Sequence, residues 1–464
     1  MGLRQVSTMG ENRSAHLKTV FVVGAGPAGM FAAQKIAQAG HQVIILNRDI
    51  KPGGLAEYGI YPTKDKMKVG LRKQFAKVLA LPNVHYLGHV TVGQNGCLSI
   101  ADLRNLEPCA IVFAVGAQGT KKLELEGSSA RGVYSAKDFV YFYNQLPPFT
   151  SQDFSIGKRV AVIGMGNVAI DIARWLLVDA PEKAAAVIVV ARRGPFEAKF
   201  DKKEFASVEG FLDREAFQRE LKRIEPQLAA VGQDISKVAD ETFPVLKKAE
   251  LQASEDSRLL FRFLSSPQRI HVDQAGRIHR LTVTENLLVQ RGESTACKAT
   301  DQTADLEVDT MIFAIGDVAD PSLGLPYGKD SYLINPDTSD AARAAYEVFD
   351  DVRSCAMQGV YVVGWARKAS EGLVGIARHD AEVGATHILK YLDCTTSKEI
   401  AVDEIKRHIE AKGVRVVDKA DLELLARAEE QQARERNLSW FKFSEDEAML
   451  AAIEAERAKA GVLV

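Results

Sequence analysis

Residues 18–34 read KTVFVVGAGPAGMFAAQ, and residues 158–174 repeat the pattern as KRVAVIGMGNVAIDIAR. Each stretch has a basic residue, a run of β-favouring apolar residues, a glycine-rich turn and an apolar pattern with helical spacing. This order is typical of the first strand, turn and helix of a βαβ unit. The copies lie 140 residues apart, too far for a solenoid repeat. The spacing indicates two nucleotide-binding domains in one chain.

Further apolar runs fit two parallel sheets around these turns. QVIILN (42–47) and AVIVVARR (186–193) are predicted second strands of the two units. AIVFAVGA (110–117), TMIFAIGD (310–317) and GVYVVGWA (359–366) are continuous apolar runs that end around a glycine. Such runs are typical of strands that are buried on both faces and end at a ligand crevice.

The order of these segments predicts an α/β fold with two Rossmann-like dinucleotide-binding domains, the second inserted into the first. The first domain is expected to use residues 1–117 and 318–395, and the second residues 118–317. Within the second, RIHVDQAGRIHRLTVTEN (269–286) alternates around an Ala-Gly turn and predicts a β-hairpin. Residues 396–464 are charged and favour helix, which predicts a helical C-terminal tail.

Composition excludes several classes of protein. The 464 residues are 46% hydrophobic and 26% charged, which excludes disorder along the whole chain. The net charge of −2 provides no bulk attraction to nucleic acid, and no apolar run is long enough for a membrane span. The five cysteines show no metal-ligand or disulfide spacing, which favours a cytoplasmic protein. They are Cys97, Cys109, Cys297, Cys355 and Cys394.

The first glycine turn has the spacing of a dinucleotide site. Gly24 permits a tight turn, Gly26 lets the backbone approach a pyrophosphate, and Gly29 allows close packing of helix on strand. The phosphates are expected over the helix N-terminus. Asn47 stands where FAD-binding copies usually have a glutamate, and it brings an amide without a charge. The Pro52–Leu55 loop, with Gly54 and Leu55, is a candidate to pass a flat cofactor ring, or a surface turn.

The second turn decides the other cofactor. It reads Gly164-Met165-Gly166-Asn167-Val168-Ala169, with the alanine that the dinucleotide pattern allows at the third place. Arg192 and Arg193 follow its second strand, where a carboxylate would select NADH. Paired guanidinium groups suit the 2′-phosphate, so we expect NADPH. A solvated surface pair is the alternative.

No other chemistry is visible in the sequence. It contains no CxxC motif for a dithiol relay, no Ser-His-Asp constellation and no metal-ligand cluster. The simplest reaction is therefore hydride transfer between NADPH and FAD. Without its own dithiol or cluster, the chain is expected to pass electrons to a partner.

The motifs together resemble the adrenodoxin-reductase-type ferredoxin–NADP⁺ reductases, which are related to the small subunit of glutamate synthase. The resemblance covers nearly the whole chain, and the segments that carry it include GGLAEYGIYP (53–62), GMGNVAIDIARWLL (164–177), ARRGPFEAKFDKKEF (191–205), LLFRFLSSPQRI (259–270) and GVYVVGWARKASEGLVG (359–375). It implies an FAD- and NADPH-dependent enzyme with an iron–sulfur partner.

The resemblance also implies site residues. Those expected along FAD are Ala28, Asn47, Leu55, Val92, Trp365, Gly372, Leu373 and Val374. Those expected to hold NADPH are Gly166 to Ala169, Arg192, Arg193, Glu204 and Gly372. Glu204 and Lys64 are the candidate catalytic residues, although an exposed helix-surface glutamate is an equal alternative for Glu204. No metal ligand is expected.

The sequence departs from the reductases around the flavin. Thr63-Lys64-Asp65 replaces an Asp-His-Pro, with Lys64 similar to the glutamate-synthase side, and residues 367–371 replace a Lys-Arg-Gly-Pro-Thr. The partner is therefore either a free ferredoxin or an iron–sulfur subunit of a larger complex. A non-catalytic FAD-bound subunit is a third hypothesis. A basic run is a candidate docking surface or a solvated helix face: Lys64, Lys66, Lys68, Arg72 and Lys73.

Overall fold

The computed structural model describes residues 17–121, 123–248, 256–369, 374–396, 399–459 and 461. The chain forms two compact units. The first contains residues 1–60, 64–119 and 318–464, and the second contains residues 61–63 and 120–317. The short strands β5 (Gly119–Thr120) and β14 (Asp317–Val318) lie where the chain passes from one unit to the other. Each unit is described separately below.

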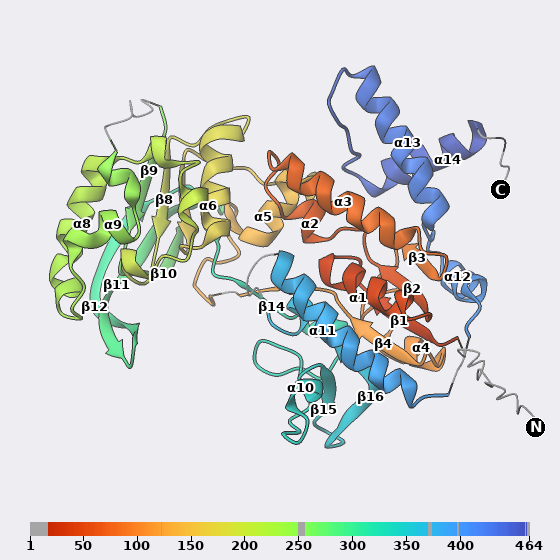
Figure 1. The fold of residues 1–464 in the computed structure, drawn as a ribbon. Coiled ribbons are helices and arrows are strands. Elements are labelled where there is room, and N and C mark those ends of the chain that lie inside the picture. Colours follow the sequence, from red (N-terminus) through yellow and green to blue (C-terminus); the bar gives the residue numbers. More distant parts are fainter. Residues whose placement is uncertain are drawn as a thin grey trace, which may run out of the picture. The chain divides into compact units, whose positions relative to one another are not determined.

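A six-stranded sheet forms the centre of the first unit (Figure 1). Its order is β15-β16-β4-β1-β2-β3, and every pairing is parallel except β15 with β16. The central strands are apolar at nearly every position and buried on both faces, as predicted. The strands are β1 (Thr19–Val23), β2 (Gln42–Asn47), β3 (Val84–Gly88), β4 (Ala110–Phe113), β15 (Glu347–Asp350) and β16 (Cys355–Val362).

Helices cover both faces of this sheet. One face carries α1 (Pro27–Gln38), α3 (Asp65–Leu79) and α11 (Val374–Asp393), and α1 packs beside α11 (Figure 1). The other face carries α4 (Ile100–Asn105) and α12 (Val402–Glu410). Two four-residue helices, α2 (Leu55–Tyr58) and α10 (Ala341–Ala344), lie in connections of the same unit.

The last helices pack against the start of this unit. Helices α13 (Lys419–Glu435) and α14 (Asp446–Lys459) share a small apolar cluster with Ile50, the residue that follows the β2 region. Ile50 is 1% exposed. The helical tail predicted for residues 396–464 is therefore present, and it belongs to the first unit.

The second unit has a five-stranded parallel sheet in the order β6-β13-β7-β8-β9. Its strands are β6 (Val133–Ser135), β7 (Arg159–Ile163), β8 (Ala186–Val190), β9 (Arg258–Arg262) and β13 (Thr310–Phe313). The helices of this unit are α5 (Ala136–Tyr143), α6 (Asn167–Arg174), α7 (Lys202–Phe205), α8 (Arg214–Ala229) and α9 (Val238–Glu241). Side chains from these helices form one large apolar core with one face of the sheet.

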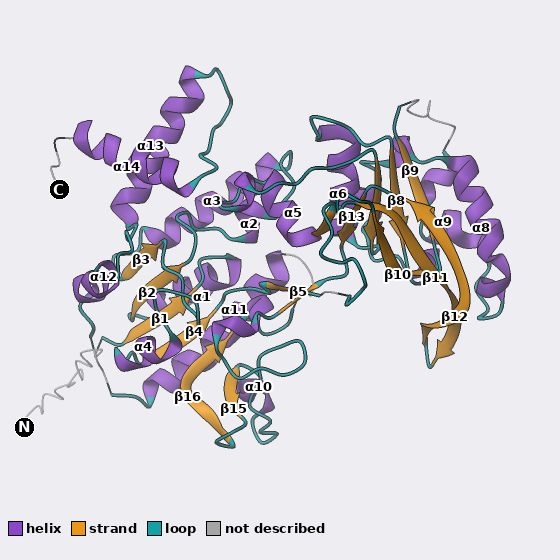
Figure 2. Cartoon of the chain, turned by 180° about the vertical axis from the view of Figure 1, so that it is seen from behind, coloured by secondary structure: helices purple, strands orange, loops and turns teal. Residues whose placement is uncertain are grey.

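A three-stranded antiparallel sheet covers the other face of the second unit (Figure 2). It contains β10 (Ser265–Val272), β11 (Ile278–Arg291) and β12 (Ser294–Glu307), in that order. The pairing of β10 with β11 confirms the hairpin predicted for residues 269–286.

The two parallel sheets share one strand order. In each, the strand before the glycine turn lies between its βαβ partner and the later apolar strand, as β4-β1-β2 and as β13-β7-β8. A ligand crevice forms at the carboxyl ends of strands where the order reverses direction. The two Rossmann-like units confirm the predicted α/β fold class. No helix in the described part of the chain is both long and apolar enough to cross a membrane.

Candidate nucleotide-binding sites

The first glycine turn, between β1 and α1, is shaped by close backbone contacts. Gly24 has a φ of +104°, and a Cβ added there would lie 2.6 Å from the carbonyl oxygen of Ala114. A Cβ on Gly29 would lie 1.9 Å from the carbonyl oxygen of Gly24. Helix α1 begins at Pro27, and its N-cap, Gly26, has no capping side chain. The first N–H groups of the helix therefore face a site suited to an anion.

Asn47 ends β2 directly beside this turn and is 6% exposed. Its Oδ1 accepts a 2.9 Å hydrogen bond from the backbone N–H of Ala25. Its Nδ2 donates to the carbonyl oxygens of Asp49 (2.8 Å) and Lys51 (3.2 Å) and to Tyr86 Oη (3.1 Å). The amide that was predicted to lie along FAD thus binds the protein itself and joins the glycine turn to the loop that follows β2.

The Gly53-Gly54 turn lies against the first glycine turn. The N–H of Gly53 donates to the carbonyl oxygen of Ala25 at 2.8 Å. Gly54 has a φ of +49°, and a Cβ there would lie 3.1 Å from the Cα of Gly26. The half-buried Leu55 begins α2. The structure therefore brings the predicted Gly54 and Leu55 to the dinucleotide motif.

The carboxyl end of β16 also reaches this site. Gly364 has a φ of +64°, and a Cβ there would lie 2.5 Å from the Cβ of Ala28. The N–H of Gly364 donates to Asp380 Oδ2 at 2.6 Å, and Asp380 also pairs with Arg367. The half-buried Trp365 follows directly. Asp380 was not predicted as a site residue, because its partners can be recognised only once α11 is folded beside β16.

Of the other residues expected along FAD, the structure describes Val374 and Val92 but not Gly372 and Leu373. Val374 is the first residue of α11, which packs on α1. Val92 follows β3 and packs in the apolar cluster on the other face of the sheet. Gly372 and Leu373 lie outside the described residues.

The second glycine turn repeats the geometry of the first. Gly164 has a φ of +121°, and a Cβ there would lie 2.2 Å from the carbonyl oxygen of Ala314. Gly166 is the N-cap of α6, without a capping side chain, and a Cβ there would meet no atom within 4 Å. Ala169 is fully buried, whereas Val168 is 47% exposed. The open space thus lies at the second glycine, where a pyrophosphate is expected to approach.

Arg192 and Arg193 follow β8 next to this turn, because the N–H of Gly164 donates to the carbonyl oxygen of Val190 at 2.9 Å. Arg192 is exposed and Arg193 is half-buried. One Nη1–H of Arg193 donates to the carbonyl oxygen of Thr295 at 3.4 Å. Among the described residues neither arginine forms an ion pair, so both charges remain available to a phosphate.

The candidate catalytic residues belong to different units. Asn167 Oδ1 accepts a 2.7 Å hydrogen bond from the N–H of Asp201, and Asp201 caps α7 through the N–H of Lys203. This bond holds α7, which carries the half-buried Glu204, beside the second glycine turn. Lys64, also half-buried, precedes α3 in the first unit. Asp201 is a further residue of the second site that was not predicted.

A family model described as pyridine nucleotide-disulphide oxidoreductase matches residues 18–325. The chain belongs to this family. It is 29% identical over 402 residues to the NADPH-ferredoxin reductase FprA of Mycobacterium leprae, covering 80% of this chain and 83% of that protein. It is 27% identical to the mitochondrial NADPH:adrenodoxin oxidoreductase of Arabidopsis thaliana, covering 93% and 95%.

A solved structure of the family has the same fold over nearly the whole chain. Mycobacterium tuberculosis FprA in complex with NADPH superposes with a TM-score of 0.76 and 25% identity, covering 95% of this chain and 99% of that one. The resemblance to ferredoxin–NADP⁺ reductases inferred from sequence is thereby confirmed.

The residues of both turns fit the dinucleotides of a pyridine nucleotide oxidoreductase. Each turn has a helix N-terminus without a capping side chain and a second glycine, Gly26 or Gly166, whose missing Cβ leaves room for a phosphate. The arginine pair adds positive charge only beside the second turn. These features fit FAD at the first turn and NADPH at the second.

The cysteines do not form the disulphide that the family name mentions. All five cysteines are free thiols, and the sequence has no CxxC pair. Within the described residues, no group of three or more His, Cys, Asp or Glu side chains is placed to hold a metal ion.

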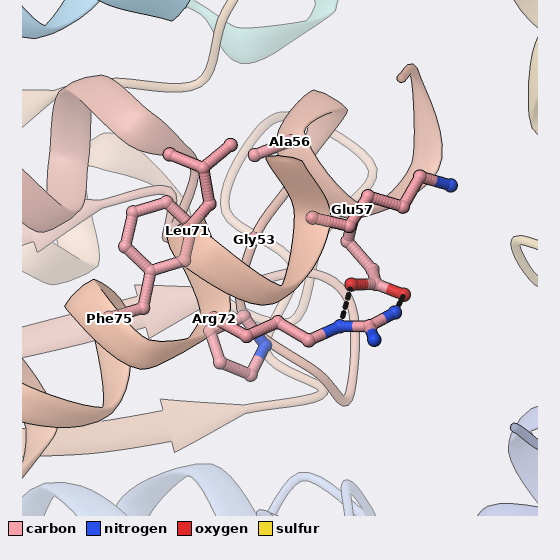
Figure 3. Close-up of a pocket in the computed structure, with 8 residues that line it drawn as sticks. Gly53, Ala56, Glu57, Leu71, Arg72 and Phe75 are labelled. Carbon is pink, nitrogen blue, oxygen red and sulfur yellow. Dashed lines mark hydrogen bonds and ion pairs between the residues drawn. The ribbon is translucent and has the colours of Figure 1, made fainter. Parts of the chain in front are cut away.

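A small pocket between α2 and α3 contains buried charges (Figure 3). Glu57 is 4% exposed, and both of its carboxylate oxygens accept 2.7 Å hydrogen bonds from Arg72. Lys442, from the segment between α13 and α14, places its Nζ 3.5 Å from Glu57 Oε1 and 4.6 Å from the ring centre of Tyr58. Lys68, on α3, is 4% exposed and lines the same pocket.

These buried groups shift one another's pKa values. Burial alone would raise the pKa of Glu57, but the bonds from Arg72 and the charge of Lys442 lower it to about 2. Burial lowers the pKa of Lys68 to about 8, against the attraction of Glu57. Burial and the neighbouring cations lower the pKa of Lys442 to about 7. The carboxylate of Glu57 therefore lies among three cationic side chains, those of Arg72, Lys68 and Lys442.

Proposed function

We propose that the chain is an FAD-dependent NADPH:ferredoxin oxidoreductase. The observation that carries the proposal is the pair of matching glycine turns, of which only the second is followed by two arginines without an acidic partner among the described residues. The relatives named above are NADPH-ferredoxin and NADPH:adrenodoxin reductases. On this proposal the first unit binds FAD and the second binds NADPH.

The chain's own residues bind and orient the two nucleotides. The N–H groups that begin α1 and α6 hold the pyrophosphates, and Arg192 and Arg193 bind the 2′-phosphate. Gly364 lets the β16 loop approach α1, and Trp365, the next residue, would lie near a bound flavin. Bound FAD would supply the capacity to accept a hydride from NADPH and to release electrons one at a time. Glu204 is proposed to orient the nicotinamide carboxamide.

Helix α3 is proposed as the surface that receives an acidic iron–sulfur protein. Lys66, Lys73 and Lys77 are exposed on it, together with Met67, which is 54% exposed. A row of exposed lysines suits an acidic partner, because charge steers the encounter. Not every member of the basic run predicted from the sequence lies on this surface, because Lys68 is buried.

The main alternative places the same chemistry in a multisubunit oxidoreductase whose other subunits carry the clusters. It is supported by Lys64 and residues 367–371, which depart from the ferredoxin reductases around the flavin. Purification from the native source distinguishes the two. Stable co-purification with cluster-bearing subunits favours the complex, whereas activity that requires only added ferredoxin favours the free enzyme. Five free thiols support placing either form in the cytoplasm.

The test of the partner is NADPH-driven reduction of cytochrome c through added ferredoxin. We expect turnover to require ferredoxin and to fall several-fold as salt rises. Lys66→Glu with Lys73→Glu should slow ferredoxin-dependent turnover without slowing reduction of the flavin by NADPH. Unchanged turnover in this variant would contradict the α3 docking surface, and no ferredoxin-dependent turnover would contradict the free-enzyme form of the proposal.

A further inference from the structure

The backbone of the arginine pair is held by the segment after β9 and by the antiparallel sheet. The carbonyl oxygen of Ala191 accepts from the N–H of Ser265 at 2.9 Å, and that of Arg193 accepts from the N–H of Leu264 at 3.2 Å. The carbonyl oxygen of Arg192 accepts instead from a side chain, Asn286 Nδ2, at 3.0 Å. Three successive carbonyl groups are therefore fixed, and only the middle one depends on a side chain.

Asn286 is built into its position. It is 3% exposed, its N–H donates to the carbonyl oxygen of Leu264 at 2.7 Å, and its Nδ2 also donates to Ser266 Oγ at 2.9 Å. The pairing of β11 with β12 shifts register between Thr284 and Asn286. Leu264 has a φ of +48°, in the left-handed region that costs a non-glycine residue energy. Both irregularities occur where the two segments meet the arginine pair.

The antiparallel sheet also contacts the side chain of Arg193. Arg193 donates to the carbonyl oxygen of Thr295 on β12, and Thr295 Oγ1 donates to Glu197 Oε1 at 2.6 Å. Among the described residues, the side chain of Arg192 forms no hydrogen bond with the sheet, and the direction of its exposed guanidinium therefore depends on its backbone. Asn286 is the side chain bonded to that backbone.

We propose that Asn286 is a positioning residue for nucleotide selectivity. It rests on the proposed function, in which the arginine pair binds the 2′-phosphate. By bonding the carbonyl oxygen of Arg192, Asn286 fixes the direction in which that side chain leaves the backbone. Less ordering is then needed when the phosphate binds, which increases affinity for NADPH and leaves affinity for NADH unchanged.

The test measures binding of NADP⁺ and NAD⁺ to the oxidised, FAD-loaded enzyme by calorimetry, without turnover. Because the two nucleotides differ only in the 2′-phosphate, their affinity ratio isolates its recognition. We expect Asn286→Ala to weaken NADP⁺ about three- to tenfold, the range of one hydrogen bond, and to change NAD⁺ less than about twofold. Equal weakening of both nucleotides, or of neither, would overturn the proposal.

A matched control and a double variant separate positioning from general damage. Asn144 is another buried asparagine of the second unit, 2% exposed, whose Nδ2 donates to the carbonyl oxygen of Val140. Asn144→Ala should leave the ratio unchanged. In an Arg192→Ala background, Asn286→Ala should have little further effect on NADP⁺. An equal loss in the control, or full additivity in the double variant, would also refute the role of Asn286.

Two further outcomes are distinguishable. Should Asn286→Ala fail to fold, Asn286→Ser keeps a polar group but is too short to reach Arg192, and must show the same selective loss. If the unmodified enzyme binds NAD⁺ as tightly as NADP⁺, the NADPH assignment of the proposed function fails. If it prefers NADP⁺ and Asn286→Ser does not reduce that preference, only the role of Asn286 fails.

Discussion

At the scale of single residues, the glycines of the second turn meet very different surroundings. Gly164 has a left-handed φ and carbonyl oxygen where its Cβ would be, whereas Gly166 faces open space. A methyl group at the first position must distort the strand. A methyl group at the second fits the protein and occupies only the space expected for the pyrophosphate.

We therefore predict opposite effects of the two alanine substitutions. Gly164→Ala should lower the free energy of unfolding by about 2 kcal/mol or more, from backbone strain and steric overlap. Gly166→Ala should leave the thermal midpoint nearly unchanged and weaken NADP⁺ roughly tenfold or more. Thermal melts and nucleotide titrations of both variants check this. A destabilised Gly166→Ala, or one that binds NADP⁺ normally, would contradict the assigned phosphate position.

The arginine pair supports a second residue-level prediction. Replacing Arg192 or Arg193 by alanine should weaken NADPH by about 1.5–3 kcal/mol for each lost charge-assisted bond and leave NADH nearly unchanged. Titration of the oxidised enzyme with NADP⁺ and NAD⁺, which cannot reduce the flavin, measures the effect. Equal losses for NADPH and NADH would show that the pair does not contact the 2′-phosphate.

Site residues that belong to a local backbone turn could be predicted from the sequence. Site residues that act through a hydrogen bond to a distant part of the chain could not. Gly24 and Gly164 are recognisable because their spacing after a strand is local. Asn286 bonds a carbonyl group 94 residues earlier, and Asp380 bonds the N–H of Gly364 from another helix. Asn47 was placed correctly at the end of β2, but its bonds to the following loop could not be foreseen.

At the scale of elements, the tail is joined to the loop that follows the first βαβ unit. Lys442 reaches Glu57 on α2, and Lys51 pairs with Glu429 on α13 at 2.5 Å. Glu429 also accepts from the N–H of Phe443 at 3.2 Å. The titratable groups around Lys442 are Glu57, Tyr58, Lys68, Arg72, Lys51 and Glu429. The tail therefore pairs with residues on both sides of the Gly53-Gly54 turn.

Lys442 should make stability depend on pH above neutrality. Its pKa is lowered to about 7 in the folded protein, whereas an unfolded lysine keeps a pKa of about 10.4. Between these values the unfolded chain binds a proton that the folded chain has released, so stability rises with pH by at most about 1.4 kcal/mol per unit. Lys442→Met should flatten this rise, as measured by urea unfolding across the range.

The control is Lys459→Met, which removes a lysine on α14 whose side chain is 58% exposed. It should keep the slope of the unmodified protein. A slope that is the same in Lys442→Met and in the unmodified protein would show that Lys442 stays protonated in the folded state.

The positions of the strands could be predicted because continuous apolar runs that end at a glycine are typical of strands buried on both faces. Helix α3 was only partly predictable. Its lysines read as one basic run, but Lys68 turns inward to the pocket with Glu57. Which cations of a helix are buried depends on the carboxylate that another element brings, and here that element is the short α2.

At the scale of the whole molecule, two units with one strand order account for the internal repeat. The apolar segments 110–117 and 310–317 resembled each other in the sequence because β4 and β13 hold the same place beside the first strand. Local pattern was enough to pair them. The membership of residues 61–63 in the second unit, and of α13 and α14 in the first, depends on tertiary packing and was not specified by local pattern.

The most direct test of the central claim is anaerobic reduction of the bound flavin, followed by its absorbance in stopped flow. The purified protein should contain FAD, and NADPH should bleach it much faster than NADH at equal concentration, because only NADPH engages the arginine pair. Absence of FAD, equal rates with the two nucleotides, or a flavin that neither nucleotide reduces would contradict the account.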